Sequence, residues 1–224
     1  MTNTTWMSHS VSYTFLPQKQ RKGAFAALLL LIATVLLAGC FGATPYVPTK
    51  DDDDLFKAKG VDKALYEAVC KGEKDPFVII AVFKKDVFLS HSAVLDKHFI
   101  PVLSEFGNVA LLLVRPTEVL PLLKDPSLTR ASWFGPQGLL ARLDPSLEFD
   151  MLKSFGKGAE SGQIIILARF RSVPESSEEK AMTTAGFNIL SKAGPTFIIS
   201  GPMSGIPKLL SHEWIAYLEK GNLP

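Results

Sequence analysis

The stretch FVIIAVFKKDVFLSHSAVLDKHFIPVLSEFG, residues 77–107, decides the fold because its pattern occurs a second time in the chain. It aligns without a gap on IIILARFRSVPESSEEKAMTTAGFNILSKAG, residues 164–194, at an offset of 87 residues. Seven of the 31 aligned positions are identical, and the order of apolar runs, polar segments and turn glycines agrees throughout. A pattern shared at a fixed offset indicates an internal duplication.

The similarity continues on both sides of this block. Upstream, Val61-Asp62 is echoed by Leu143-Asp144. Downstream, after a slip of one residue, the first copy's Pro116, Pro121, Leu123 and Gly135 match Pro202, Pro207, Leu209 and Gly221. We therefore expect two tandem domains, over residues 58–138 and 139–224.

Each copy predicts the same series of elements. Apolar runs predict strands and amphipathic segments predict helices. In the first copy we expect helices at 63–70, after Ser90 and at 117–125, and strands at 77–84, 100–106, 109–114 and 128–134. In the second copy we expect helices at 146–153, after Ser176 and at 203–212, and strands at 164–171, 187–193, 196–200 and 214–219. After the leading helix the order is βαββαβ, which predicts an α+β fold of two ferredoxin-like domains with antiparallel sheets.

The first strand of each copy is apolar without alternation. A sheet with one wet face alternates apolar and polar residues along each strand, whereas FVIIAVF at 77–83 and IIILA at 164–168 do not. We therefore expect both faces of these strands to be covered. Since helices cover only one face, the other should meet the sister repeat or another protein.

The N-terminus has the order of a secretory signal. Lys19-Gln20-Arg21-Lys22 is followed by an uncharged apolar run at 24–38 and by Leu37-Ala38-Gly39-Cys40. This ending resembles the lipobox of bacterial lipoproteins, which implies cleavage after residue 39 and a lipid on Cys40. Phe41 follows where inner-membrane lipoproteins often carry Asp, so the resemblance favours the outer membrane, facing the periplasm. An uncleaved transmembrane helix is the alternative, although the apolar run is short for a span.

Residues 40–57 are Pro-rich and then acidic. The run Asp51-Asp52-Asp53-Asp54 is expected to repel itself and stay hydrated, so the segment predicts an extended tether. A calcium site is the more specific hypothesis for these four aspartates, but calcium loops space their carboxylates by two residues around a glycine turn.

Composition excludes several classes of function. Three of the 24 basic residues lie in the leader, so the rest of the chain is almost neutral against 22 acidic residues, and nucleic-acid binding is not expected. Two cysteines exclude a disulfide-stapled fold.

No group of residues predicts catalysis, a metal or a cofactor. His91 and His98 lie two helical turns apart, which is too far for one metal ion. His212-Glu213 has no nucleophile elbow, and Cys70 is expected to be a small apolar core residue. The segment at 156–162, GKGAESG, lacks the end of a phosphate loop and predicts a connector. We expect no enzyme.

The pattern as a whole resembles the inhibitor-type propeptide of subtilisin-family serine proteases. The residues that carry the resemblance are Val61-Asp62, Leu65, Lys71-Gly72, the strand at 77–84, Gly107, Pro116 and the second-copy ending Trp214-Ile215-Ala216-Tyr217-Leu218-Glu219. In that family the open sheet face packs on the protease and the C-terminal tail lies along the active-site cleft. The resemblance implies a binding module whose candidate contact residues are Trp214, Tyr217, Leu218, Asn222 and Leu223.

Three hypotheses follow for the function. The first is a lipid-anchored binding protein that inhibits a secreted subtilisin-type protease or assists its folding. The second is a structural or assembly protein of the envelope, in which the two open sheet faces pack on each other without a protease partner. The third is a small-ligand sensor, because interfaces between domains commonly hold pockets.

Overall fold

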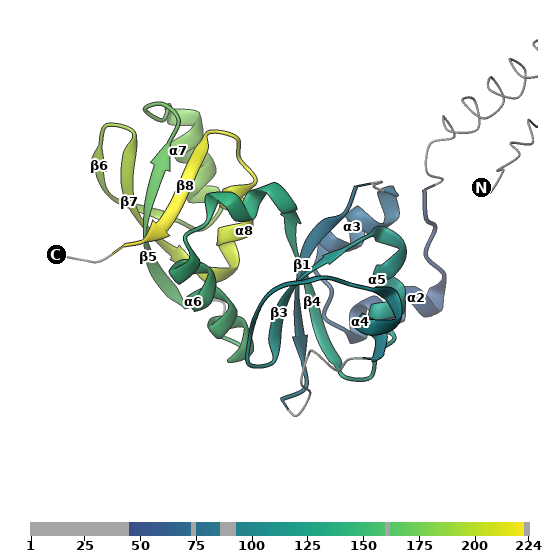
Figure 1. The fold of residues 1–224 in the computed structure, drawn as a ribbon. Coiled ribbons are helices and arrows are strands. Elements are labelled where there is room, and N and C mark those ends of the chain that lie inside the picture. The colour runs from purple at the N-terminus through teal and green to yellow at the C-terminus, as the bar shows by residue number, and fades with distance from the viewer. Residues whose placement is uncertain (1–44, 73–74, 86–92, 160–161, 222–224) are drawn as a thin grey trace, which may run out of the picture. The chain divides into compact units, whose positions relative to one another are not determined.

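The computed structural model describes residues 45–72, 75–85, 93–159 and 162–221. Residues 45–224 form one compact unit, and residues 1–44 lie outside the described residues. The described part is a mixed α+β protein with two four-stranded antiparallel sheets (Figure 1).

The first sheet is built from residues 77–136. Its strands are β1 (Phe77–Phe83), β2 (Val102–Phe106), β3 (Val109–Val114) and β4 (Leu128–Pro136). They lie in the order β2-β3-β1-β4, so β1 pairs with β3 and with β4. Helix α4 (Ala93–His98) connects β1 to β2, α5 (Pro116–Leu123) connects β3 to β4, and α3 (Lys63–Lys71) precedes the sheet.

The second sheet repeats this arrangement. Its strands are β5 (Gln163–Phe170), β6 (Asn188–Ala193), β7 (Thr196–Pro202) and β8 (Ile215–Lys220), in the order β6-β7-β5-β8. Helix α7 (Ser176–Thr184) connects β5 to β6, and η3 (Met203–Gly205) with α8 (Ile206–Leu210) connects β7 to β8. The short helix η2 (Gln137–Arg142) and α6 (Pro145–Gly156) precede the sheet. The duplicated order of elements predicted from the sequence is confirmed.

Local sequence explains why the two copies fold alike. The leading helices of both copies begin after an aspartate, and the carboxylates of Asp62 and Asp144 each accept a hydrogen bond of 2.8 Å from a backbone N–H of the first turn, that of Leu65 or Ser146. The β2–β3 and β6–β7 hairpins each turn at a glycine with positive φ, +61° at Gly107 and +58° at Gly194. Glycine adopts this conformation without a steric penalty.

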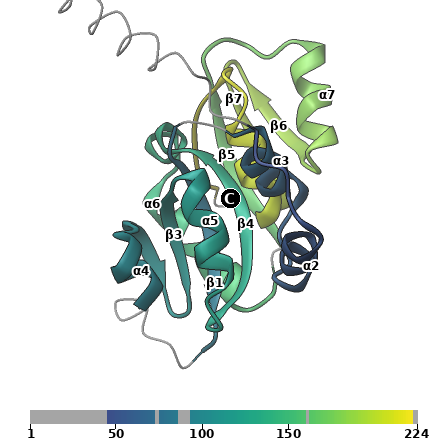
Figure 2. The same ribbon diagram turned by 90° about the vertical axis from the view of Figure 1, so that its right-hand side faces the viewer.

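The first core lies between the first sheet and the helices before and around it. Figure 2 shows α5 in front of β1, β3 and β4, with α3 and α2 beside it. The sheet contributes Phe77, Ile79 and Phe83 on this face, all at most 1% exposed. Helices α3 and α5 contribute Leu65, Val119 and Leu122, all fully buried.

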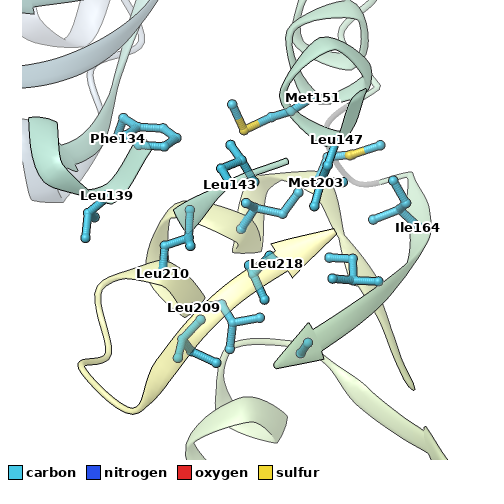
Figure 3. Packing of buried hydrophobic residues seen from close by; sticks show 14 of the residues in the cluster. Phe134, Leu139, Leu143, Leu147, Met151, Ile164, Met203, Leu209, Leu210 and Leu218 are labelled. Carbon is cyan, nitrogen blue, oxygen red and sulfur yellow. The ribbon is translucent and has the colours of Figure 1, made fainter. Parts of the chain in front are cut away.

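The second core joins both sheets through α6. Val78, Ile80 and Phe134 of the first sheet belong to the same buried cluster as Leu218 of β8. Helix α6 contacts β1, β2 and β3 as well as β8. Figure 3 shows the cluster, which contains Phe134, Leu139, Leu143, Leu147, Met151, Ile164, Met203, Leu209, Leu210 and Leu218. The second sheet thus shares its core with the back of the first sheet.

The predicted extended tether is wrong from residue 50 onward. Residues 50–58 form helix α2 (Lys50–Ala58), which Thr49 caps by accepting a hydrogen bond from the N–H of Asp52 at 3.3 Å. The Asp52 carboxylate accepts one from the N–H of Thr49 at 3.0 Å, which completes a capping box. The acidic run lies in the first turn, where the helix dipole favours negative charge, and Phe56 is buried in the first core.

We expect the cap of α2 to weaken in acid. Hydrogen bonds from Tyr46 and Thr49 lower the pKa of Asp52 from 3.8 to about 2. Because the folded value lies below the unfolded one, the ionised carboxylate stabilises the fold above about pH 4, and this contribution is lost as the pH falls toward about 2. Thermal unfolding followed by circular dichroism across this range measures it.

The Tyr46→Phe substitution removes the largest cause of the lowered pKa. The variant should lose less stability between about pH 4 and pH 2 than the unchanged protein, because the folded-state pKa of its Asp52 lies closer to 3.8, and Asp52→Asn should lack this acid-dependent part. Superimposable pH profiles for all three proteins would contradict the assignment.

Candidate functional site

One face of the second sheet carries apolar side chains that no helix of the described residues covers. Ile165 and Leu167 of β5 and Ile198 of β7 are each half-buried. Leu167 pairs directly with Ile198 in the ladder, and Ile165 lies two residues along β5 on the same face. None of the three belongs to either core. We call Ile165, Leu167 and Ile198 the open-face row.

The equivalent residues of the first sheet are fully covered. The offset of 87 residues matches the open-face row to Val78, Ile80 and Leu111, which are 0%, 1% and 0% exposed. All three belong to the core that α6 completes. The expectation of two covered faces is therefore correct for β1 but wrong for β5, along which buried residues alternate with half-buried or exposed ones.

Helix α6 causes this difference between the sheets. Its Phe149 packs edge-on against Phe106 of β2, with ring centroids 4.6 Å apart. At its C-terminal end, a Cβ on Gly156 would lie only 3.1 Å from the Val109 side chain of β3. The apolar residues of α6 occupy more than one side of the helix, at positions 147, 149, 151, 152 and 155. A helix with a broad apolar surface packs on more than one neighbour, so these apolar positions indicate the two-sided packing of α6 in the sequence itself.

Polar groups border the open-face row. Arg169 of β5 donates a hydrogen bond from Nε to Glu219 Oε1 of β8 at 2.8 Å, and its Nη2 forms an ion pair with the same oxygen at 2.7 Å. Tyr217 of β8 stands opposite Arg169 in the ladder, and partial burial together with the Asp144 carboxylate raises the pKa of its phenol. An apolar centre with a polar rim is the usual anatomy of a protein-binding surface.

The structure separates the predicted contact residues. Tyr217 lies on the open face. Leu218 is fully buried in the second core and cannot reach a partner, because successive strand residues point to opposite faces. Trp214 packs against that core. Asn222 and Leu223 lie outside the described residues. The sequence did not single out the open-face row itself.

The turn before β8 is a rigid aromatic segment. Trp214 stacks between Phe170, at 5.7 Å, and His212, at 4.7 Å, and burial lowers the pKa of His212. Arg142 Nη1 donates to the carbonyl oxygens of His212 at 3.0 Å and Ile215 at 2.8 Å. These contacts fix the path of the chain into β8 and give His212 a packing role.

The other residues considered for chemistry do not assemble into a site. His91 lies outside the described residues, and His98 ends α4. Among the described residues, no three potential metal ligands are placed so that they could hold a metal ion. This also applies to the aspartates of α2. Cys70 is partly buried at the end of α3, and burial raises the pKa of its thiol, which lowers the thiolate fraction.

The predicted lipid site, Cys40, also lies outside the described residues, as does the apolar run at 24–38. Within the described ranges, no helix is long and apolar enough to cross a membrane. Lipidation and placement at the outer membrane therefore stay predictions from the sequence.

Comparison with known proteins adds no assignment. No family model matches the chain, and neither curated proteins nor solved structures gave a match. The residues and their geometry are therefore the only basis for proposing a function.

The two sheets offer a matched test of the uncovered face. Ile80→Ala should lower the free energy of unfolding by about 2–5 kcal/mol, because it opens a cavity beneath α6. Leu167→Ala, at the equivalent half-buried position, should cost about 1 kcal/mol. Urea denaturation of the full chain in nonionic detergent measures both values. Equal losses would show that the second face is covered after all.

Proposed function

We propose that this protein is a lipid-anchored envelope protein whose second repeat docks on a protein partner through the open-face row. One observation carries the proposal: three apolar residues keep part of their surface exposed on the second sheet, while their equivalents on the first sheet are fully buried. Helix α6 covers this surface in the first copy, whereas in the second copy the equivalent surface is open to another molecule. Burial of apolar side chains is the main favourable term in protein association.

We further propose that both repeats are ferredoxin-like domains. Two features support this: antiparallel sheets with the orders β2-β3-β1-β4 and β6-β7-β5-β8, and helices that connect the first strand to the second and the third to the fourth. A resemblance to inhibitor-type propeptides is compatible with this arrangement and favours a subtilisin-type protease as the partner.

The start of the C-terminal tail is consistent with such a partner. The N–H of Gly221 donates to the Ile165 carbonyl at 2.9 Å, so the chain leaves the sheet beside the open-face row. A Cβ on Gly221 would lie 2.8 Å from Ile165 Cγ2, so this close approach needs glycine. A partner seated on the open face would meet the tail at the same edge, as the propeptide resemblance implies.

The packing of the first repeat favours a second candidate function for the protein, that of a structural support. Its back face is filled by α6, so it holds the second repeat instead of offering a surface. If the open-face row binds no protease, an envelope spacer or assembly protein remains the function proposed. The back of the first sheet and the open-face row do not cover each other, since α6 fills the former and the latter lies outside both cores.

Protease inhibition tests the leading proposal. Full-length protein in nonionic detergent should inhibit at least one member of a panel of secreted subtilisin-type proteases, with an inhibition constant at or below about micromolar. Leu167→Glu should weaken inhibition at least about tenfold, because it places a charge in the apolar centre. The control is Val173→Glu, which changes an exposed apolar residue in the loop after β5. Lack of inhibition across the panel, or equal effects of the two variants, would refute the proposal.

The lipid anchor can be tested separately by intact mass spectrometry. We expect a mature protein that begins at Cys40 and carries acyl chains, and Cys40→Ala should abolish both the cleavage and the added lipid mass. The alternative transmembrane anchor predicts an unmodified chain that keeps residues 1–39 in both proteins.

A further inference from the structure

A cleft of about 630 Å³ lies where the C-terminal end of α6 meets the first sheet. Strands β1 and β4, the β2–β3 hairpin and the end of α6 all contribute to it. Its lining residues are Val82, Lys85, Phe106, Gly107, Asn108, Thr129, Arg130, Lys153, Phe155, Gly156, Lys157 and Gly158. This volume is within the range of small-molecule sites.

The charge of the cleft is entirely positive among the described residues that line it. Lys85 comes from the end of β1, Arg130 from β4, and Lys153 and Lys157 from α6 and its C-terminus. None of the described lining residues is acidic. Lys85, Lys153 and Lys157 are exposed and reach the cleft from two separate segments, which makes a site for a multiply charged anion.

Two nearby carboxylates are directed elsewhere. Asp150, one helical turn before Lys153, pairs with Lys220 of β8 at 2.6 Å. Glu105 precedes the lining residue Phe106 on β2, and successive strand residues point to opposite faces, so Glu105 is turned away from the cleft. Neither group neutralises the lysines of the cleft.

The walls suit a compact ligand. The guanidinium of Arg130 lies over the Phe155 ring, 5.2 Å from its centroid, which holds its planar fork in place. Asn108 uses one amide N–H on the Phe83 carbonyl, at 2.5 Å, and keeps its second N–H for a ligand. An added Cβ at Gly107 or Gly158 would meet nothing within 4 Å, so a ligand can approach the backbone closely at these two positions.

We propose that this cleft binds a phosphorylated small anion. Phosphate groups carry several negative charges and acceptor oxygens, which match the point charges of the three lysines. The segment at 156–158, which the sequence predicts to be a connector, then has a second role as one wall of the site. The same chemistry is offered by a free phosphorylated molecule and by a phosphomonoester lipid headgroup.

Binding by full-length protein in nonionic detergent tests the cleft and separates the two sources. The soluble probe is inorganic pyrophosphate, followed by isothermal titration calorimetry. The lipid probe is phosphatidylcholine vesicles with and without phosphatidic acid, followed by flotation. We expect saturable pyrophosphate binding with a Kd below about one millimolar. Vesicle binding that requires phosphatidic acid and that pyrophosphate displaces assigns the cleft to a headgroup, and pyrophosphate binding alone assigns it to a free ligand.

A matched pair of double variants tests the location. Lys153→Ala with Lys157→Ala should weaken pyrophosphate binding at least about tenfold, because two charge-assisted contacts are lost. The control, Lys50→Ala with Lys180→Ala, removes the same charge from exposed positions on α2 and α7 and should leave the Kd unchanged. All four lysines are exposed, so both proteins should fold, as circular dichroism can verify.

Two results would overturn the proposal: no saturable binding of either probe, or equal weakening by both double variants, which reflects net charge alone. The cleft variants should leave protease inhibition intact, since none of their residues lies on the open face. Loss of anion binding and loss of inhibition are therefore separate outcomes.

Discussion

The packing of α6 against the back of the first sheet is the contact on which the rest of the structure depends. It buries Val78, Ile80 and Leu111 completely and joins both repeats in one apolar cluster. Without it, two sheets would each present an apolar face to water, and the chain would hold two marginal domains. Because α6 belongs to the second repeat in sequence but covers the back of the first sheet, the second core contains residues of both repeats.

The same contact makes a duplicated chain asymmetric. Equivalent positions in β1 and β5 carry similar apolar side chains, yet only those of β1 are closed off. Helix α6 buries the back of the first sheet only, so the equivalent face of the second sheet stays partly exposed. The Arg169–Glu219 ion pair lies at the border of that exposed face. One sheet is therefore closed on both faces while the other keeps a partly exposed apolar face, and the cleft at the end of α6 arises from the same junction.

Much of the fold could be predicted from the sequence, because strand and helix periodicities are local and occur twice. Asp62, Asp144, Gly107 and Gly194 mark the same boundaries in both copies. The sites could not be predicted, since they arise from contacts between distant segments: Lys85, Arg130 and Lys157 share a cleft without sharing a motif. Repulsion between the like charges of the acidic run predicts an extended segment. The helix dipole and the Thr49 cap outweigh that repulsion, so the segment is helical.

Helix α2 also limits how far the folded body can stand from a bilayer. An extended segment through residue 57 would give a lipidated Cys40 a reach of about 60 Å, but the helix begins at Lys50 and its Phe56 is fixed in the first core. The nine intervening residues span at most about 30 Å. If Cys40 carries the predicted lipid, the start of α2 therefore lies within about 30 Å of the headgroups, instead of standing off by the full length of an extended tether.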